Sequence, residues 1–184
     1  TPALLIPVVG NVVPALAGQE LGFPLWSAAQ FGIGVVFWPV LLVLFGVRLG
    51  LEGLWPQRLL PTTFVTVAPP AVIGLGLLQF GAPLPLAFAA WGVALFFLAW
   101  SAAILRPMRE QPFGIPFWAV SFPLAAFSAL SWRLVPAGGA GMQLVATVAL
   151  ALTSLVVLSL SWATVQGLRH GSLLVPEPGP AQPA

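Results

Sequence analysis

The chain has 184 residues, of which 59% are hydrophobic and only 5% are charged, and its net charge is +2. A soluble domain usually carries about 25% charged residues, so this composition excludes a water-soluble globular protein. The absence of cysteine excludes disulfides and thiol catalysis, and the absence of a basic patch argues against nucleic-acid binding.

Six stretches are apolar enough and long enough to be predicted as membrane-spanning helices, since a span needs about 20 mostly apolar residues. Short connections between them favour antiparallel neighbours. We therefore predict an all-α integral membrane domain over residues 1–174, followed by a disordered tail at 175–184. Because apolar sequence begins almost at Thr1, we also expect a preceding part of the protein to be missing. The predicted spans cover residues 2–17, 24–47, 60–80, 84–105, 113–135 and 143–168.

The arginines predict the orientation of these spans. Six spans place five of the six arginines on one side of the membrane and leave Arg133 on the other. Arginine-rich loops usually stay in the cytoplasm, so we expect a multi-pass cell-membrane protein with a cytoplasmic C-terminus. The five arginines on the predicted inner side are Arg48, Arg58, Arg106, Arg109 and Arg169.

Prolines recur in the middle of every odd-numbered span, at Pro7, at Pro69 with Pro70, and at Pro123. A proline removes one backbone hydrogen bond and kinks a helix, and in hydrocarbon the freed carbonyl needs a partner. We therefore expect three hairpins, each with a broken inner helix beside protein or a water-filled path and a regular outer helix facing lipid. The alternative is that membrane helices simply tolerate proline more often than soluble ones.

Groups that could perform acid–base or metal chemistry are scarce. His170 follows the last span and is expected to be interfacial rather than a ligand or proton carrier. No zinc-protease, phosphate-loop or nucleophile-elbow motif is present, so we expect neither an enzyme nor a cofactor. All four glutamates lie in predicted loops or the tail, and they are Glu20, Glu52, Glu110 and Glu177.

An uncharged lumen lined by kinked helices suits an anion, because helix-end dipoles and backbone N–H groups supply a weak positive potential. Phe122, just before Pro123, is placed to close such a lumen by steric block and dewetting. The alternative is that Phe122 packs between helices as one of thirteen phenylalanines. Asn11 and Ser121 stand out among the polar residues because they lie at the kinks. The candidate pore-lining and kink residues are Pro7, Gly10, Asn11, Pro14, Thr66, Pro69, Pro70, Ser121 and Pro123.

Three motifs carry a family resemblance. They are Ile-Pro-Val-Val-Gly-Asn-Val-Val-Pro at 6–14, Val-Ala-Pro-Pro-Ala-Val at 67–72, and Phe-Trp-Ala-Val-Ser-Phe-Pro-Leu-Ala-Ala at 117–126. In this order they resemble the tellurite-resistance/C4-dicarboxylate transporter family, which includes the plant slow-type guard-cell anion channels. The resemblance covers nearly the whole chain except its tail.

The resemblance implies ten transmembrane helices in five hairpins around a central pore, commonly in a homotrimer. This chain would supply the last six helices. A phenylalanine on the ninth helix blocks the pore in the family, which implies Phe122 here, with Phe113 and Phe117 as alternatives. The implied partners are membrane lipid and small anions, either chloride- or nitrate-like, sulfite, or C4-dicarboxylates such as malate. The competing hypothesis is a membrane scaffold or subunit without transport activity.

Overall fold

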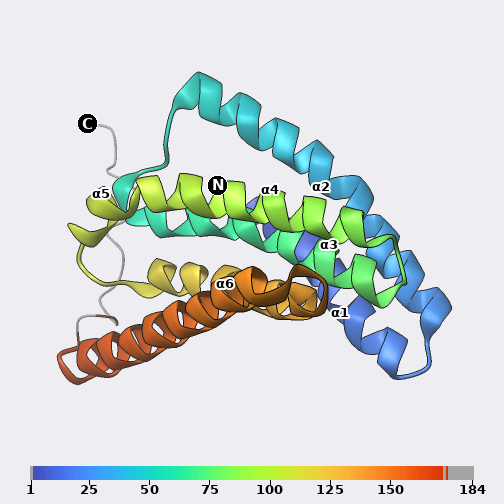
Figure 1. Ribbon diagram of the computed structural model, residues 1–184. Coiled ribbons are helices and arrows are strands. Elements are labelled where there is room, and N and C mark those ends of the chain that lie inside the picture. Colours follow the sequence, from blue (N-terminus) through green and yellow to red (C-terminus); the bar gives the residue numbers. More distant parts are fainter. Residues whose placement is uncertain (1, 172, 174–184) are drawn as a thin grey trace.

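The computed structural model describes residues 2–171 and 173 of the chain. The described residues form helices joined by turns and short loops, and no strand occurs among them. Most of the helices run in roughly the same direction or its reverse (Figure 1). This arrangement agrees with the predicted all-α class. The predicted disordered tail at 175–184 lies outside the described residues.

Each predicted odd-numbered span begins as a 3₁₀ helix and continues directly as an α-helix. The 3₁₀ helices η1 (Pro2–Leu5), η2 (Gln57–Val67) and η3 (Ile115–Val120) lead into α1 (Ile6–Glu20), α3 (Ala68–Gln79) and α6 (Ser121–Arg169), respectively. The remaining helices are α2 (Pro24–Glu52), α4 (Leu84–Ala103) and the short α5 (Leu105–Arg109). The broken character of the odd spans is thus a change of helix type.

The repeated prolines lie at these changes of helix type. Pro7, Pro69 and Pro123 all fall within the first three residues of an α-helix, as does Pro70. Proline fits there because the N–H groups of a first turn have no partner inside the α-helix. These four prolines therefore do not bend an α-helix from within, and the predicted breaks in the odd spans are changes of helix type.

Helix α6 is two antiparallel arms rather than one rod. Gly139 has φ 61° and ψ −153°, a conformation that suits glycine and interrupts the helix. The two arms fold back beside each other (Figure 1). Trp118 Nε1–H of η3 donates to Thr164 Oγ1 at 3.0 Å although the residues are 46 apart in sequence. In a straight helix they would be about 69 Å apart.

Four helical stretches of the described chain are long and apolar enough to cross a membrane. The stretch predicted at 2–17 is not among them, and the last one contains both arms of α6. Helix α2 also continues five residues beyond the predicted end of its span at Val47, and it ends at Gly53, whose φ of 71° suits glycine. The four stretches are Pro24–Glu52, Gln57–Gln79, Leu84–Ala103 and Ile115–Arg169.

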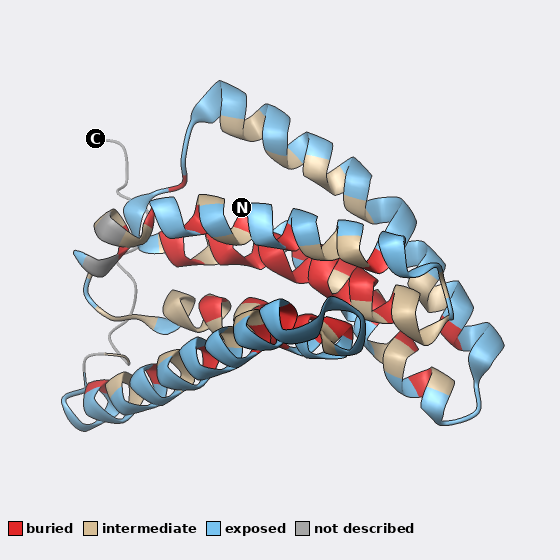
Figure 2. Ribbon diagram, viewed as in Figure 1, coloured by how far each residue is buried: buried red, intermediate tan, exposed pale blue. Residues whose placement is uncertain are grey.

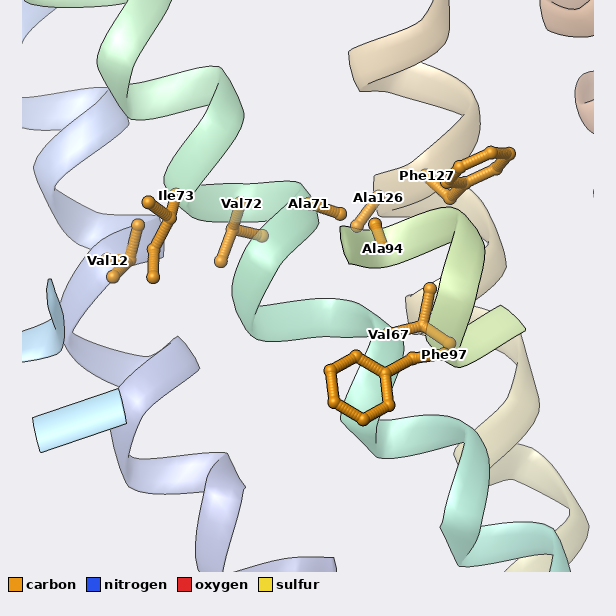
Figure 3. Packing of buried hydrophobic residues seen from close by; sticks show 9 residues of the cluster. All are labelled: Val12, Val67, Ala71, Val72, Ile73, Ala94, Phe97, Ala126 and Phe127. Atoms are coloured by element: carbon orange, nitrogen blue, oxygen red, sulfur yellow. The ribbon is translucent and has the colours of Figure 1, made fainter. Parts of the chain in front are cut away.

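The core lies around η2 and α3. Figure 2 shows this segment buried in the middle, with α2 and the second arm of α6 largely exposed. Val67 and Ala71 of this segment pack with Val12 of α1, Phe97 of α4 and Phe127 of α6 in one cluster (Figure 3). The cluster therefore joins three hairpins through one central segment.

Candidate functional site

The three odd-numbered spans lie side by side. Helix α3 contacts both α1 and α6, and η2 contacts both η1 and η3. Helices α2 and α4 pack chiefly against α1 and α3, which precede them in the chain. We call η1–α1, η2–α3 and η3 with the first arm of α6 the inner row.

A groove of about 360 Å³ runs between the members of the inner row. Its wall is almost entirely apolar, and none of its lining residues is charged. Backbone N–H groups do not form its surface, which differs from the positive lumen expected from the sequence. The groove is lined by Ile6, Val9, Gly10, Val13, Val65, Ala68, Ala119, Phe122 and Pro123.

The lining residues follow helical spacing on each segment. Ile6, Val9, Gly10 and Val13 of α1 are separated by three, one and three residues, and so share one helix face. The pair from η2 and α3 is also three residues apart, as are Ala119 and Phe122. Sequence reasoning missed most of these residues because it followed the prolines. The three-and-four spacing of apolar residues around Gly10 is a signal that could have found those on α1.

Three of the predicted site residues line the groove, namely Gly10, Phe122 and Pro123. Phe122 is 44% exposed, a large value for a phenylalanine that begins a helix in the inner row. The structure therefore brings the predicted gate residue to the wall shared by all three odd spans. The predicted residues outside this wall are Pro7, Asn11, Pro14, Thr66, Pro69, Pro70 and Ser121.

The polar candidates bond their own helices. Asn11 Nδ2–H donates to the Pro7 carbonyl at 2.8 Å, and Ser121 Oγ–H donates to the Trp118 carbonyl at 2.7 Å. Buried Thr66 donates its hydroxyl to the Thr63 carbonyl at 2.8 Å. Asn11 and Ser121 therefore bond carbonyls three or four residues back, as hydroxyl-bearing residues elsewhere in the spans do, and the bond at Ser121 uses the hydroxyl hydrogen that an anion would need.

The two alternative gate residues have other surroundings. Phe113 and Phe117 pack against each other with ring centroids 5.7 Å apart. Phe117 also packs on a cluster that includes Leu60 and Phe64 of η2. Neither phenylalanine lines the groove, so Phe122 is the only one of the three that faces it.

Arg48 and Glu52 interact at the C-terminal end of α2. Arg48 forms an ion pair with Glu52 at 3.0 Å and donates to the Gly53 carbonyl at 2.6 Å. Its guanidinium lies 3.9 Å from the ring centroid of Trp55. Within the described part of the chain no group of three His, Asp or Glu side chains could hold a metal ion.

Comparison with known proteins gives a family match over most of the chain. The family described as voltage-dependent anion channel (SLAC1) matches residues 1–165. The S-type anion channel SLAH2 of Arabidopsis thaliana is 30% identical over 120 residues, which are 65% of this chain and 23% of that protein. The S-type anion channel SLAH1 of the same plant is 30% identical over 130 residues, 67% of this chain and 33% of that protein.

A fungal protein also matches. The sulfite efflux pump SSU1 of Trichophyton rubrum is 26% identical over 168 residues, which are 73% of this chain and 44% of that protein. The chain thus spans between about a quarter and somewhat under half of the length of these curated relatives. All of them are named as channels or pumps rather than enzymes.

Proposed function

The chain belongs to the voltage-dependent anion channel family, and we propose that it forms part of an anion-conducting pore that Phe122 closes. The observation that carries this proposal is the groove shared by the three members of the inner row. Phe122 is half-exposed and faces a wall of apolar side chains. A constriction of this kind blocks ions by excluding water as well as by filling space.

We propose that the six predicted spans are crossings of a larger pore with ten helices. The two arms of α6 would then count as two crossings, and η1–α1 would count as a further one, which raises the four stretches found by length and composition to six. The relatives are two to four times longer than the matched region, which supports a pore completed by a further part of the protein. We also propose assembly as a homotrimer, which the family resemblance supports.

The orientation remains a proposal that rests on the arginines. Arg48 lies in the last turns of α2, and Arg58 lies at the start of η2, so the two residues flank the connection between the first and second hairpins. Arg106 and Arg109 lie in α5, which follows α4 at that end of the helices. The excess of arginine favours a cytoplasmic location for this end and for the C-terminus of α6.

The proposed substrates are small anions. Two relatives are named as S-type anion channels and one as a sulfite efflux pump. Chloride- or nitrate-like ions, sulfite and C4-dicarboxylates such as malate are therefore the candidates. Because the groove wall carries no charge, we infer that it acts as a barrier and that selectivity for one of these anions is set elsewhere along the pore.

Anion flux into liposomes that contain the full-length protein tests this function. Phe122→Ala should raise chloride, nitrate or sulfite flux at least about tenfold, since lowering a barrier by about 1.4 kcal/mol has that effect. Phe37→Ala is the matched control, because Phe37 is 54% exposed on α2 and lies outside the groove. Flux of Phe122→Ala equal to that of Phe37→Ala would disprove the gate. No flux for any of these proteins would favour the scaffold hypothesis.

A further inference from the structure

A second and larger groove, of about 580 Å³, lies between α4 and the second arm of α6. Leu98 and Ala102 of α4 form one side, and Leu144 and Leu152 of α6 form the other. Its floor includes Phe64 of η2, which belongs to the inner row. The groove therefore reaches from the outer surface of the helices to the row that carries Phe122.

The lining residues are apolar throughout, so water has few partners there. An apolar cavity of about 150 Å³ already stays dry and takes up benzene-sized molecules, and this groove is several times larger. Leu144 and Val156, its end residues on α6, are about 18 Å apart along the helix. That length exceeds half of the roughly 30 Å hydrocarbon core, and it suits a flexible hydrocarbon chain that lies along the helices.

One end of the groove is next to α5, a helix whose sequence contains two arginines. Leu105 lines the groove, and it is the first residue of α5, which also contains Arg106 and Arg109. Basic residues at the edge of a membrane attract anionic lipid headgroups.

We propose that this groove binds an acyl chain of an anionic phospholipid whose headgroup lies at α5. We call it the lipid groove. Val120 and Leu124 line it, and each is two residues from Phe122, which places them on the other side of the segment that bears the proposed gate. The bound chain supports this segment from behind. The lipid site exists whether or not the protein conducts anions.

Native mass spectrometry of the full-length protein tests lipid binding directly. The protein is released from detergent that contains equal amounts of phosphatidylglycerol and phosphatidylcholine. Wild type should retain phosphatidylglycerol. Ala102→Phe fills the groove and should lower retention about tenfold or more, since a phenyl ring displaces two or more methylene groups of the acyl chain. Ala103→Phe is the matched control, because Ala103 is exposed on the same helix and lies outside the groove.

A second pair of variants, on α6, distinguishes loss of lipid binding from misfolding of Ala102→Phe. Ala149 lines the groove on α6 and Ala151 does not, so Ala149→Phe should lose the lipid and Ala151→Phe should keep it. Equal retention within both pairs would overturn the proposal. Oligomers that dissociate in the groove variants, with no lipid on wild type, would assign the groove to a second copy and would also overturn it.

The placement of the headgroup at α5 is tested by the preference for phosphatidylglycerol over phosphatidylcholine. The double variant Arg106→Gln with Arg109→Gln should bind phosphatidylglycerol and phosphatidylcholine about equally, because both basic residues of α5 are gone. An unchanged preference for phosphatidylglycerol would overturn the placement of the headgroup at α5.

Discussion

Helix α2 and the segment η2–α3 are both long and apolar, but their burial is opposite. In Gln57–Gln79, 83% of the most apolar window is buried, against 6% in Pro24–Glu52. The exposed helix is nevertheless the more hydrophobic, with a mean hydropathy of 2.1 against 1.5. In a water-soluble protein the more hydrophobic of the two helices would be the buried one. The difference shows that hydropathy does not identify the core of this protein.

Small and polar residues mark the buried segment. Thr63 and Thr66 are almost fully buried in η2, and Gly74 and Gly76 lie in α3. Lipid tails are as apolar as leucine, so packing between membrane helices depends on close approach and on hydrogen bonds. A Cβ added to Gly74 would lie 2.6 Å from Leu130 Cδ2, which shows how closely α3 and α6 approach.

A charge on the exposed face of α2 should have the largest effect. Val43 is 65% exposed near the middle of this helix, so in water Val43→Arg would be harmless. In hydrocarbon the substitution costs about 3 kcal/mol, and we expect a large loss of membrane-integrated protein. Leu51→Arg is the control, because Leu51 is 82% exposed at the end of α2 and arginine can reach the interface there. Equal integration of the two variants in a membrane-insertion assay would contradict a lipid-facing α2.

A larger side chain within the buried segment η2–α3 should have the second-largest effect, which is a loss of stability. Gly74→Val forces a methyl group against Leu130 and Ala90, and overpacking of this kind costs about 1–3 kcal/mol. Gly92→Val on α4 is the matched control, because nothing lies within 4 Å of a Cβ built there. Thermal unfolding in detergent should show a lower midpoint for Gly74→Val alone. A similar shift in both would mean that helix propensity, not close approach, determines the effect.

The hydrogen bond between α4 and α6 should contribute less to the free energy of unfolding than the close packing at Gly74. Trp91 Nε1–H donates to Ser131 Oγ at 2.9 Å, and buried Ser131 donates in turn to the Phe127 carbonyl. Ser131→Ala leaves the indole N–H without this acceptor, and such bonds in membranes are worth about 0.6–1.7 kcal/mol. Ser154→Ala removes only a local bond on an exposed face and should be neutral. Unfolding free energies that agree for the two variants would contradict this contribution.

Loss of the Arg48 contacts in the loop after α2 should have the smallest effect on stability. Arg48→Gln removes the ion pair with Glu52 and the contact with the ring of buried Trp55, which together contribute about 1 kcal/mol. We expect faster proteolysis at residues 53–56, and a difference from wild type that shrinks at high salt. Arg133→Gln, on an exposed residue of α6, should leave this rate unchanged. Proteolysis that is equally fast in both variants would contradict a role for the Arg48 contacts.

Part of the candidate site could be predicted from the sequence. The repeated prolines indicated where the odd spans break, and the gap between the predicted spans 113–135 and 143–168 indicated the connection within α6. The type of helix could not be predicted, because η2 keeps 3₁₀ geometry over eleven residues, longer than such runs usually are. Its stability there depends on neighbours distant in sequence, such as Leu60 and Phe64 packing on Ile104 and Met108.

The amino-acid sequence by itself determined that this protein belongs in a bilayer and that its odd spans are broken, because both follow from composition and from the missing N–H of proline. Only the tertiary structure decided which apolar residues face one another. Phe122 and Phe117 are the same residue type on the same span, yet one faces the groove and the other packs on η2. That choice depends on how η3 and α6 are rotated against α1 and η2, and such a rotation is set by contacts between hairpins.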